Sequence, residues 1–278
     1  MKILVTGANG QLGYDVIKEL QYRNIKCFGA SRSDFDLINE KEIKTWIIQY
    51  KPDVVIHCAA YTAVDKAEDE PELCYKINAL ATKAIAEACK EVDAKMVYIS
   101  TDYVFPGTGD TYYEVDDQTN PLNVYGQTKL AGEVAVKQIL NKYFIVRTSW
   151  VFGANGDNFV KTMLRLGQTR HELNIVNDQI GSPTYTVDLA RLLCDMVVTD
   201  QYGVYHATNE GVCSWAEFAK EIFGLSKISV NIKPISSSKY VVRAKRPLNS
   251  RLSKRCLTSA KIGKMPTWQN ALKRFLEK

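Results

Sequence analysis

The chain is poor in histidine and has no closely spaced cysteines. Its three histidines lie far apart, and none of its seven cysteines belongs to a C-x-x-C pair. Zinc sites require such ligands at short, fixed spacings, so the sequence predicts no metal centre. The odd number and scattered positions of the cysteines also argue against a disulfide framework. Reduced thiols, as in cytoplasmic proteins, are the better interpretation.

Long apolar runs and low-complexity segments are missing too. No stretch approaches the roughly 18 apolar residues of a membrane span, and the N-terminus begins with a predicted strand rather than a cleavable leader. We therefore expect a cytoplasmic protein with no membrane partner. The formal net charge of +5 is too small to indicate nucleic-acid binding. The one dense basic stretch, residues 243–255, is interpreted as solvated surface, with contact to phosphates as the alternative.

Short apolar runs alternate with helical patterns through the first half of the chain. Predicted strands cover residues 2–6, 25–30, 53–58, 95–100 and 143–149, and predicted helices cover 11–23, 39–50, 71–92 and 125–141. Apolar strands that alternate with helices are typical of a parallel sheet covered on both faces. We therefore predict a doubly wound, Rossmann-like α/β domain over residues 1–150. Such sheets bind ligands at the carboxyl ends of their strands.

The periodicity weakens after residue 150. Helical patterns near 158–169, 186–199, 214–224 and 267–277 accompany short strands near 173–176 and 228–234, and residues 235–256 show no clear period. We interpret residues 151–278 as mainly a smaller C-terminal substrate lobe. We expect this lobe to be interleaved with the first domain, so that part of residues 185–210 belongs to the first domain.

A glycine-rich turn joins the first predicted strand to the first predicted helix. Its glycines are spaced G-x-x-G-x-x-G, one residue wider than the dinucleotide-binding fingerprint. Such a turn lets the backbone approach a pyrophosphate, which the helix N-terminus attracts. A plain tight turn is the alternative. The residues of this turn expected at a cofactor are Gly7, Asn9, Gly10, Gln11, Leu12 and Gly13.

The ends of the second and third predicted strands supply further cofactor candidates. Ser31 and Arg32 follow the second strand, where an arginine accommodates the 2′-phosphate of NADP and an acidic residue binds the ribose of NAD. Arg32 therefore favours NADPH, whereas Asp34 keeps NADH open. The remaining candidates, beside the adenine or under the cofactor, are Asp36, Leu37, Ala59, Ala60 and Tyr61.

Thr101, Tyr125 and Lys129 are the candidate catalytic residues. A Tyr-x-x-x-Lys step on a helix places phenol and ammonium one turn apart on one face, where a hydroxyl from a strand end can join them. Tyr125 would donate a proton to a carbonyl oxygen as a hydride reaches the carbon. Lys129 is expected to lower the pKa of the phenol and to bind the nicotinamide ribose. Thr101 would hold the carbonyl oxygen.

Together, the glycine turn, the segment STDYVF (100–105) and Tyr-x-x-x-Lys resemble the extended short-chain dehydrogenase/reductase superfamily. Four segments resemble its dTDP-4-dehydrorhamnose reductase family: CAAYTAVD (58–65), RTSWVFG (147–153), DQIGSPT (178–184) and RPLNS (246–250). The resemblance covers nearly the whole chain. It implies reduction of the C4 keto group of a dTDP-6-deoxy-sugar with NADPH or NADH, giving dTDP-L-rhamnose for cell-surface polysaccharide.

The resemblance also implies a set of substrate contacts. These are Val64, Thr101, Asp102, Tyr103, Tyr125, Trp150 and Arg246. Arg246 would meet the nucleotide diphosphate; a surface position is the alternative, as simple packing is for Val64. Some family members dimerise through acidic residues that share Mg²⁺. Asp15 is one carbon shorter than the glutamate expected there, which argues against a bridging Mg²⁺ and leaves a homodimer as an open expectation.

Alternatives of other kinds stay open. Another nucleotide-sugar 4-ketoreductase would share every motif and differ in pocket shape. A regulatory subunit similar to the β-subunit of methionine adenosyltransferase would share the fold and need no turnover. The intact Thr/Tyr/Lys set favours an enzyme. An epimerase or dehydratase is disfavoured, because dehydratases carry an acidic pair after the threonine where this chain has Asp102 and Tyr103.

Overall fold

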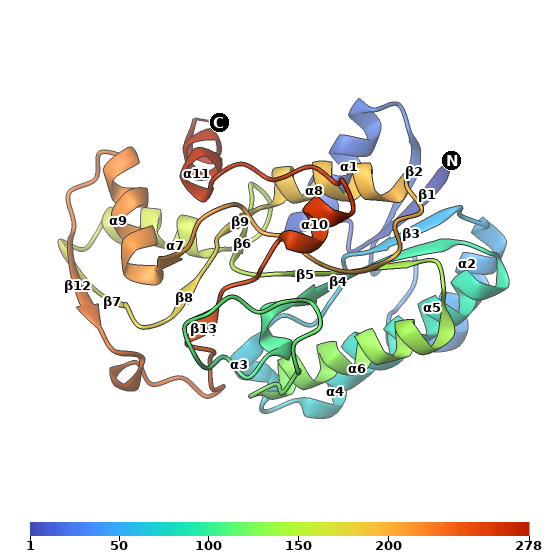
Figure 1. Ribbon diagram of the computed structural model, residues 1–278, viewed down its shortest axis with the longest axis horizontal. Helices are drawn as coiled ribbons and strands as arrows, with labels where there is room; N and C mark the ends of the chain where they lie inside the picture. The colour runs from blue at the N-terminus through green and yellow to red at the C-terminus, as the bar shows by residue number, and fades with distance from the viewer. Residues whose placement is uncertain (278) are drawn as a thin grey trace.

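A six-stranded parallel sheet forms the centre of the protein (Figure 1). The computed structural model describes residues 1–277. The strands lie in the order β10-β5-β4-β3-β1-β2. They are β1 (Lys2–Thr6), β2 (Lys26–Ala30), β3 (Val54–His57), β4 (Lys95–Thr101), β5 (Tyr143–Thr148) and β10 (Gly203–His206). The order reverses between β1 and β3, and doubly wound sheets bind their ligands at such a reversal.

Helices cover both faces of this sheet (Figure 1). Ile3 and Val5 pack with α1 (Gln11–Tyr22) and α8 (Thr186–Val197), whereas Leu4 packs with helices on the opposite face. Those helices are α2 (Glu40–Tyr50), α5 (Ala81–Glu91) and α6 (Val124–Ile139). The alternation follows from the two-residue period of a strand. The doubly wound α/β fold predicted from the sequence is confirmed.

One edge of the sheet comes from far along the chain. β10 pairs in parallel with β5, from Gly203 opposite Phe144 to His206 opposite Arg147. The preceding helix, α8, packs on α1. Residues 186–206 therefore lie against the first 150 residues of the chain.

A smaller lobe occupies the left of Figure 1. Its short strands are β6 (Val151–Phe152), β7 (Glu172–Val176), β8 (Ile180–Gly181), β9 (Thr184–Tyr185), β11 (Cys213–Ser214), β12 (Asn231–Ile235) and β13 (Asn249–Ser250). Its helices are α7 (Phe159–Gly167), α9 (Trp215–Leu225) and α11 (Trp268–Leu276), while α10 (Arg255–Ser259) packs on β10. Aromatic side chains dominate the core of this lobe, including buried Phe152, Phe218 and Phe223.

The helix predicted over residues 71–92 is present, but it contains a π-helical turn at its centre. The structure has α3 (Val64–Ala67), α4 (Pro71–Tyr75) and then a π-helical turn, Lys76–Leu80, before α5. The side chain of Asn78 in this turn hydrogen-bonds the backbone of Tyr61, a contact that residue spacing does not reveal. Wider turns of this type occur frequently at functional sites.

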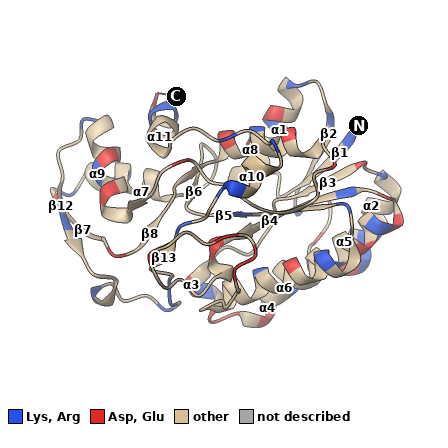
Figure 2. Cartoon of the chain, viewed as in Figure 1, with Lys and Arg blue, Asp and Glu red and all other residues tan. Residues whose placement is uncertain are grey.

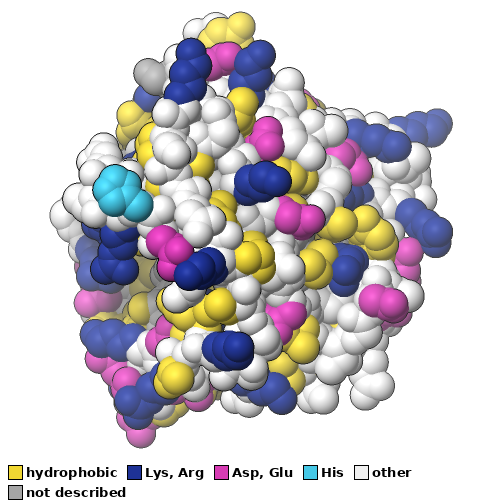
Figure 3. Space-filling view, turned by 90° about the vertical axis from the view of Figure 1, so that its left-hand side faces the viewer, with side chains coloured by type: hydrophobic (Ala, Val, Ile, Leu, Met, Phe, Trp, Pro, Cys, Tyr) yellow, Lys and Arg dark blue, Asp and Glu magenta, His cyan; other side chains and the backbone are white. Residues whose placement is uncertain are grey.

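Acidic partners match the basic stretch at residues 243–255. The ion pairs are Arg243–Asp69, Arg246–Asp65, Lys254–Glu210 and Arg255–Glu114. Figure 2 shows basic and acidic residues distributed over both parts of the fold, and Figure 3 shows them interspersed on the outer face of the small lobe. Arg243 and Arg255 are solvent-exposed, as the solvated-surface interpretation expects, whereas the side chains of Arg246 and Lys254 are only 29% and 10% exposed.

The described residues contain no helix that is long and apolar enough to cross a membrane. Among the same residues, no group of three or more histidine, cysteine, aspartate or glutamate side chains is placed to hold a metal ion. All seven cysteines are free thiols.

Candidate active site

The glycine turn is packed too tightly for side chains at two of its positions. Gly7 has a φ of +70°, and a Cβ there would lie 2.8 Å from the backbone nitrogen of Ala59 at the end of β3. A Cβ on Gly13 would lie 2.2 Å from the carbonyl oxygen of Gly7. The turn therefore brings bare backbone between the carboxyl ends of β1 and β3, where the strand order reverses.

The start of α1 suits a bound phosphate. Gly10 is the N-cap residue and has no side chain to satisfy the first N–H groups, and the first turn holds no acidic residue. These groups carry the positive end of the helix dipole, which attracts anions. The residues present thus fit a dinucleotide whose pyrophosphate lies against Gly10, Gln11 and Leu12.

Two asparagines of the small lobe hydrogen-bond the glycine turn and the start of α1. Asn155 donates a hydrogen bond from Nδ2 to the carbonyl oxygen of Asn9 at 2.7 Å, and Asn158 donates from Nδ2 to Oε1 of Gln11 at 3.0 Å. Sequence reasoning missed both asparagines, because more than 140 residues separate them from the turn.

At the end of β2, Asp34 turns inward. Its Oδ2 accepts hydrogen bonds from the backbone nitrogen of Ser31 at 2.8 Å and from the Ser31 hydroxyl at 3.0 Å. Arg32 is exposed, as is Asp36 on the loop before α2, while Leu37 packs against the apolar cluster under that helix. The carboxylate of Asp34 therefore occupies the donors that Ser31 offers at this strand end.

The end of β3 is fixed by Asn78. Its Oδ1 accepts from the backbone nitrogen of Tyr61 at 2.8 Å, and its Nδ2 donates to the Tyr61 carbonyl at 3.1 Å. The same Nδ2 donates to Oγ1 of Thr128 at 3.1 Å, between Tyr125 and Lys129 on α6. Asn78 thus ties the predicted cofactor strand end, which includes Ala59 and Ala60, to the helix of the catalytic candidates.

Helix α6 begins against the end of β4. Its N-cap residue, Asn123, accepts from the Gly126 nitrogen at 2.8 Å. A Cβ on Gly126 would lie 2.3 Å from the carbonyl oxygen of Tyr103, so the glycine lets α6 approach the 3₁₀ turn Asp102–Val104 closely. This contact places Tyr125 beside Tyr103, with ring centroids 5.6 Å apart and nearly perpendicular.

Thr101 ends β4 and lies next to the phenol. Its hydroxyl donates to Oδ1 of Asp102 at 3.0 Å and accepts from the backbone nitrogen of Tyr103 at 3.2 Å. It also faces the Tyr125 hydroxyl, and this hydrogen bond opposes the rise that burial causes in the pKa of that phenol. The structure therefore brings Thr101, Asp102, Tyr103 and Tyr125 together.

Burial has the largest effect on the pKa of Tyr125. Burial, with smaller contributions from Asp102 and Tyr103, raises the pKa of Tyr125 above its ordinary value. Burial also lowers the pKa of Lys129 to about 7, against an opposing effect of Glu133. The net shift of the Tyr125 pKa in the protein without bound cofactor is therefore upward, and the lowering by Lys129 stays a prediction. The phenol is protonated at neutral pH, as a proton donor must be.

A buried ion pair supports the helix one turn beyond Lys129. Arg147 donates from Nε to Oε1 of Glu133 at 2.9 Å and from Nη2 to Oε2 at 2.7 Å. The Ser100 hydroxyl donates to Oε1 of Glu133 at 2.6 Å. Sequence reasoning missed this network, because Ser100 and Arg147 belong to strands that lie 33 and 14 residues from Glu133 in the chain.

Asp102 offers an unsatisfied oxygen to the site. Its side chain is buried, and Oδ2 has no well-formed hydrogen-bond partner among residues 1–277. Burial raises the pKa of Asp102 to about 6, while the facing hydroxyls of Ser250 and Thr101 oppose the rise. Unsatisfied buried acceptors are rare in folded proteins, and a ligand hydroxyl would remove the deficit.

The other predicted substrate residues lie around this point. Trp150 follows β5 and contacts Gly181 of β8. Arg246 lowers the pKa of Tyr103, against a larger rise caused by burial, so its guanidinium lies near that phenol. Its Nη2 is bound to Oδ2 of Asp65 at 2.5 Å, so in this structure it has a protein partner. Val64 is half-buried at the start of α3.

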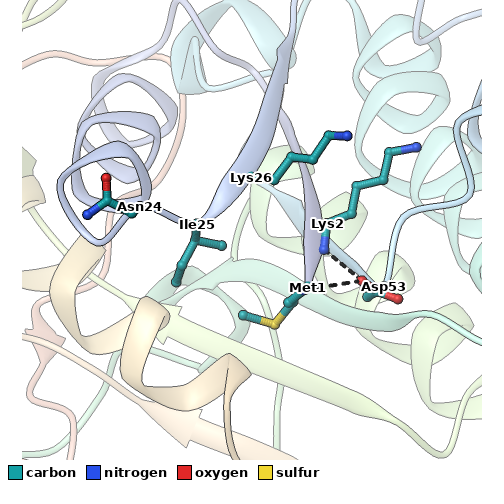
Figure 4. Close-up of a pocket in the computed structure, with 6 residues that line it drawn as sticks. All are labelled: Met1, Lys2, Asn24, Ile25, Lys26 and Asp53. Atoms are coloured by element: carbon teal, nitrogen blue, oxygen red, sulfur yellow. Dashed lines mark hydrogen bonds and ion pairs between the residues drawn. The ribbon is translucent and has the colours of Figure 1, made fainter.

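Two other features of the structure lie outside the site. Asp15 is only 6% exposed and its carboxylate accepts a hydrogen bond from Thr186, so it points between α1 and α8 rather than outward. A surface hollow lined by Met1, Lys2, Asn24, Ile25, Lys26 and Asp53 lies at the amino ends of β1 and β2 (Figure 4). That edge is opposite to the one where the candidate residues gather, so the hollow is not the active site.

The comparisons with known proteins agree with this geometry. The family described as "RmlD substrate binding domain" matches residues 1–278. The dTDP-4-dehydrorhamnose reductase of Escherichia coli (strain K12) is 39% identical over 294 residues, which cover 99% of this chain and 97% of the relative. The chain belongs to the dTDP-4-dehydrorhamnose reductase family. The recognition of that family from sequence motifs is confirmed.

Three further proteins are similar to the chain, the third of them in fold alone. The spore coat polysaccharide biosynthesis protein SpsK of Bacillus subtilis (strain 168) is 38% identical over 276 residues, covering 99% of this chain and 97% of the relative. The structure of a dTDP-4-dehydrorhamnose reductase from Bacillus anthracis in complex with NADP has a TM-score of 0.97 at 44% identity, covering 99% of this chain and 98% of that chain. The Thermus thermophilus UDP-glucose 4-epimerase, at 17% identity and a TM-score of 0.83, shares the fold.

Proposed function

We propose that the protein reduces the C4 keto group of dTDP-4-dehydro-L-rhamnose with NADPH and forms dTDP-L-rhamnose. The observation that carries this proposal is the meeting of Thr101, Tyr125 and Asp102 at the same edge of the sheet as the glycine turn, in a member of this family. The names of full-length relatives support the substrate. The enzyme would act in the cytoplasm. Its product would be used to make cell-surface polysaccharide, as the resemblance implies.

NADPH is the proposed cofactor, with NADH as the alternative. When bound, it supplies the hydride. The backbone at Gly7, Gly10 and Gln11 would hold its pyrophosphate, and Ser31 and Arg32 would face the adenosine ribose. The NADP complex of the B. anthracis relative supports this choice. No bridging Mg²⁺ is part of the proposal, because the carboxylate of Asp15 is buried against Thr186.

Tyr125 would donate the proton. Its raised pKa keeps the phenol protonated, so Oη can transfer a proton to the C4 oxygen as negative charge develops there. The Thr101 hydroxyl, which faces the phenol, would hold the same oxygen by a hydrogen bond. Lys129 would hold the nicotinamide ribose and, when charged, ease the loss of the Tyr125 proton.

Asp102 and Trp150 would hold the sugar. The unsatisfied Oδ2 of Asp102 can accept a hydrogen bond from a sugar hydroxyl, and this bond would orient the ring relative to Tyr125. The indole of Trp150 would pack on an apolar face of the pyranose. In this proposal the two contacts would bring the keto group within reach of the phenol.

The test is oxidation of NADPH followed by its absorbance, with and without dTDP-4-dehydro-L-rhamnose. We expect turnover only with the sugar, and NMR of the product should show the rhamno configuration. A product of the other configuration at C4 would indicate another 4-ketoreductase. No turnover, together with tight binding to a separate enzyme, would indicate a regulatory subunit instead.

A further inference from the structure

Two indoles from distant parts of the chain are stacked at the edge of the site. The rings of Trp150 and Trp215 have centroids 3.6 Å apart and planes inclined by 12°. Trp150 follows β5 of the central sheet, and Trp215 is the first residue of α9 in the small lobe. Contact over whole ring faces buries a large apolar area and fixes the relative orientation of the rings.

The backbone of Trp150 is strained. Its φ of +49° lies in the left-handed region, which bulky residues rarely adopt. Such conformations persist only where the surroundings hold them, and they are concentrated at ligand sites. Here Gly181 leaves space for the indole, since a Cβ at that position would lie 2.8 Å from Cε2 of Trp150.

Trp215 is itself held firmly. Its Nε1 donates to Oε1 of Gln179 at 3.1 Å, and the ring of Phe159 packs on it with centroids 4.5 Å apart. A complete capping box between Ser214 and Glu217 fixes the helix start from which the indole extends. Trp215 is therefore a rigid surface for its neighbour.

The stacked pair is joined to the sugar site through a short sheet. Gly181 of β8 pairs with Ser250 of β13, and a Cβ on Gly181 would lie 3.0 Å from the Cβ of Ser250. The Ser250 hydroxyl faces the buried carboxyl of Asp102. The Trp150 indole and the carboxyl of Asp102 thus lie on either side of the paired residues Gly181 and Ser250.

We propose that Trp215 is a positioning residue for the sugar: by stacking on Trp150 it holds that indole in its strained orientation as an apolar wall of the pocket. This inference rests on the proposed function, because the ligand it concerns is the deoxy-sugar of the substrate. Trp215 touches no reacting atom and acts through Trp150. Its loss should weaken binding of the sugar and leave cofactor binding unchanged.

The experiment compares the wild-type protein with Trp215→Leu, Trp215→Phe and Trp268→Leu. Trp268 offers a control in the core of the same lobe, because it is buried and packs edge-on against Phe218, one ring removed from Trp215. The measurements are kcat, KM for the dTDP-4-keto-6-deoxy-sugar, KM for NADPH, and circular dichroism. Closely stacked indoles couple their electronic transitions, so the stack should give a paired dichroism signal.

We expect Trp215→Leu to raise KM for the sugar about two- to twelve-fold, the usual contribution of an aromatic pair. Its KM for NADPH should stay at the wild-type value, and the paired dichroism signal should disappear. Trp215→Phe keeps a stacking ring and should retain sugar binding within about twofold, on the same scale. Trp268→Leu should keep both KM values and the dichroism pair even though it loses stability.

Several results would overturn the inference. They are an unchanged sugar KM in Trp215→Leu, an equal rise in Trp268→Leu, or a Trp215→Phe variant as impaired as a leucine variant. If Trp215→Leu does not fold, a Trp215→Phe protein that loses sugar binding contradicts the stacking role, and one that keeps it supports the role. Absence of turnover in the wild-type protein would instead contradict the proposed function, while the dichroism pair would still report the stack.

Discussion

The ammonium nitrogen of Lys129 lies 4.1 Å from the centroid of the Tyr98 ring. The face of the ring is one of the few favourable partners for the charge in this buried position. The Tyr98 hydroxyl also donates to the backbone carbonyl of Lys129 at 3.2 Å, so the ring cannot move away independently. Lys129 therefore changes between its charged and neutral forms near neutrality, because burial lowers its pKa to about 7.

This relationship predicts a fall in kcat/KM as pH rises through about 7. Lys129 is charged below its pKa and neutral above it, and only the charged form assists the departure of the Tyr125 proton. A pH profile of kcat/KM reports the free enzyme and is the appropriate measurement. Lys129→Arg, which stays charged, should lose this alkaline limb while reacting more slowly. A profile that stays flat well above neutrality would contradict the assignment.

Tyr125→Phe removes one hydroxyl and little volume. We expect kcat to fall by ~10²–10⁴, the usual contribution of a positioned acid. Binding of NADPH, followed by its fluorescence, should be nearly unchanged. Tyr22→Phe, at an exposed position on α1, is the matched control and should be indistinguishable from wild type. Near-normal kcat in Tyr125→Phe would show that the proton comes from elsewhere.

Arg32→Ala tests the preference for NADPH. A guanidinium bound to the 2′-phosphate contributes ~1.5–3 kcal/mol, or roughly one to two decades in kcat/KM. The variant should therefore lose NADPH efficiency and keep NADH efficiency. Asp34→Asn should shift selectivity further toward NADPH, because the carboxylate that now binds Ser31 would repel the phosphate. Equal losses with both cofactors, or none, would mark Arg32 as an ordinary surface residue.

Asp102→Asn should stabilise the fold while it weakens the enzyme. The pKa of Asp102 is raised from 3.8 to about 6, so this group's contribution to stability is present below the lower value and is lost as pH rises through the higher one. Removing the charge should recover at most about 3 kcal/mol near neutrality. Urea unfolding should show a gain that grows from about pH 4 to pH 7. A variant less stable than wild type at pH 7 would contradict the burial argument.

Glu133→Gln should destabilise the fold. It leaves the guanidinium of Arg147 buried without its counter-charge, which costs about 3–5 kcal/mol. Glu133→Leu combined with Arg147→Met removes both charges and should recover much of that loss. Urea midpoints of the single and double variants decide the matter. Glu91→Gln, near the end of α5, serves as the control for losing one carboxylate.

Local spacing explains what could be predicted from the sequence. The glycine turn and the pair Tyr125 and Lys129 each lie within a few residues, and their geometry follows from the turn or the helix that contains them. The apolar strands likewise predicted the parallel sheet. These features depend on chain periodicity alone, so no knowledge of distant contacts was required.

The missed features all depend on contacts between distant segments. Asn155 reaches the glycine turn from the other lobe, and the stacking of Trp215 on Trp150 joins residues from two lobes. The net upward shift of the Tyr125 pKa was missed for the same reason. Burial is set by the whole surroundings of the phenol, whereas the sequence showed only its neighbour Lys129.

The late return of the chain to the sheet has a consequence for synthesis on the ribosome. Until residues 186–206 emerge, β5 is an unprotected edge strand, and the apolar face of α1, with Val16 and Leu20, has no partner helix. A fragment of residues 1–150 would expose both. The sheet is therefore incomplete on the ribosome until residues 186–206 have been synthesised. Exposed apolar surface and an unpaired strand edge favour aggregation and chaperone binding during this interval.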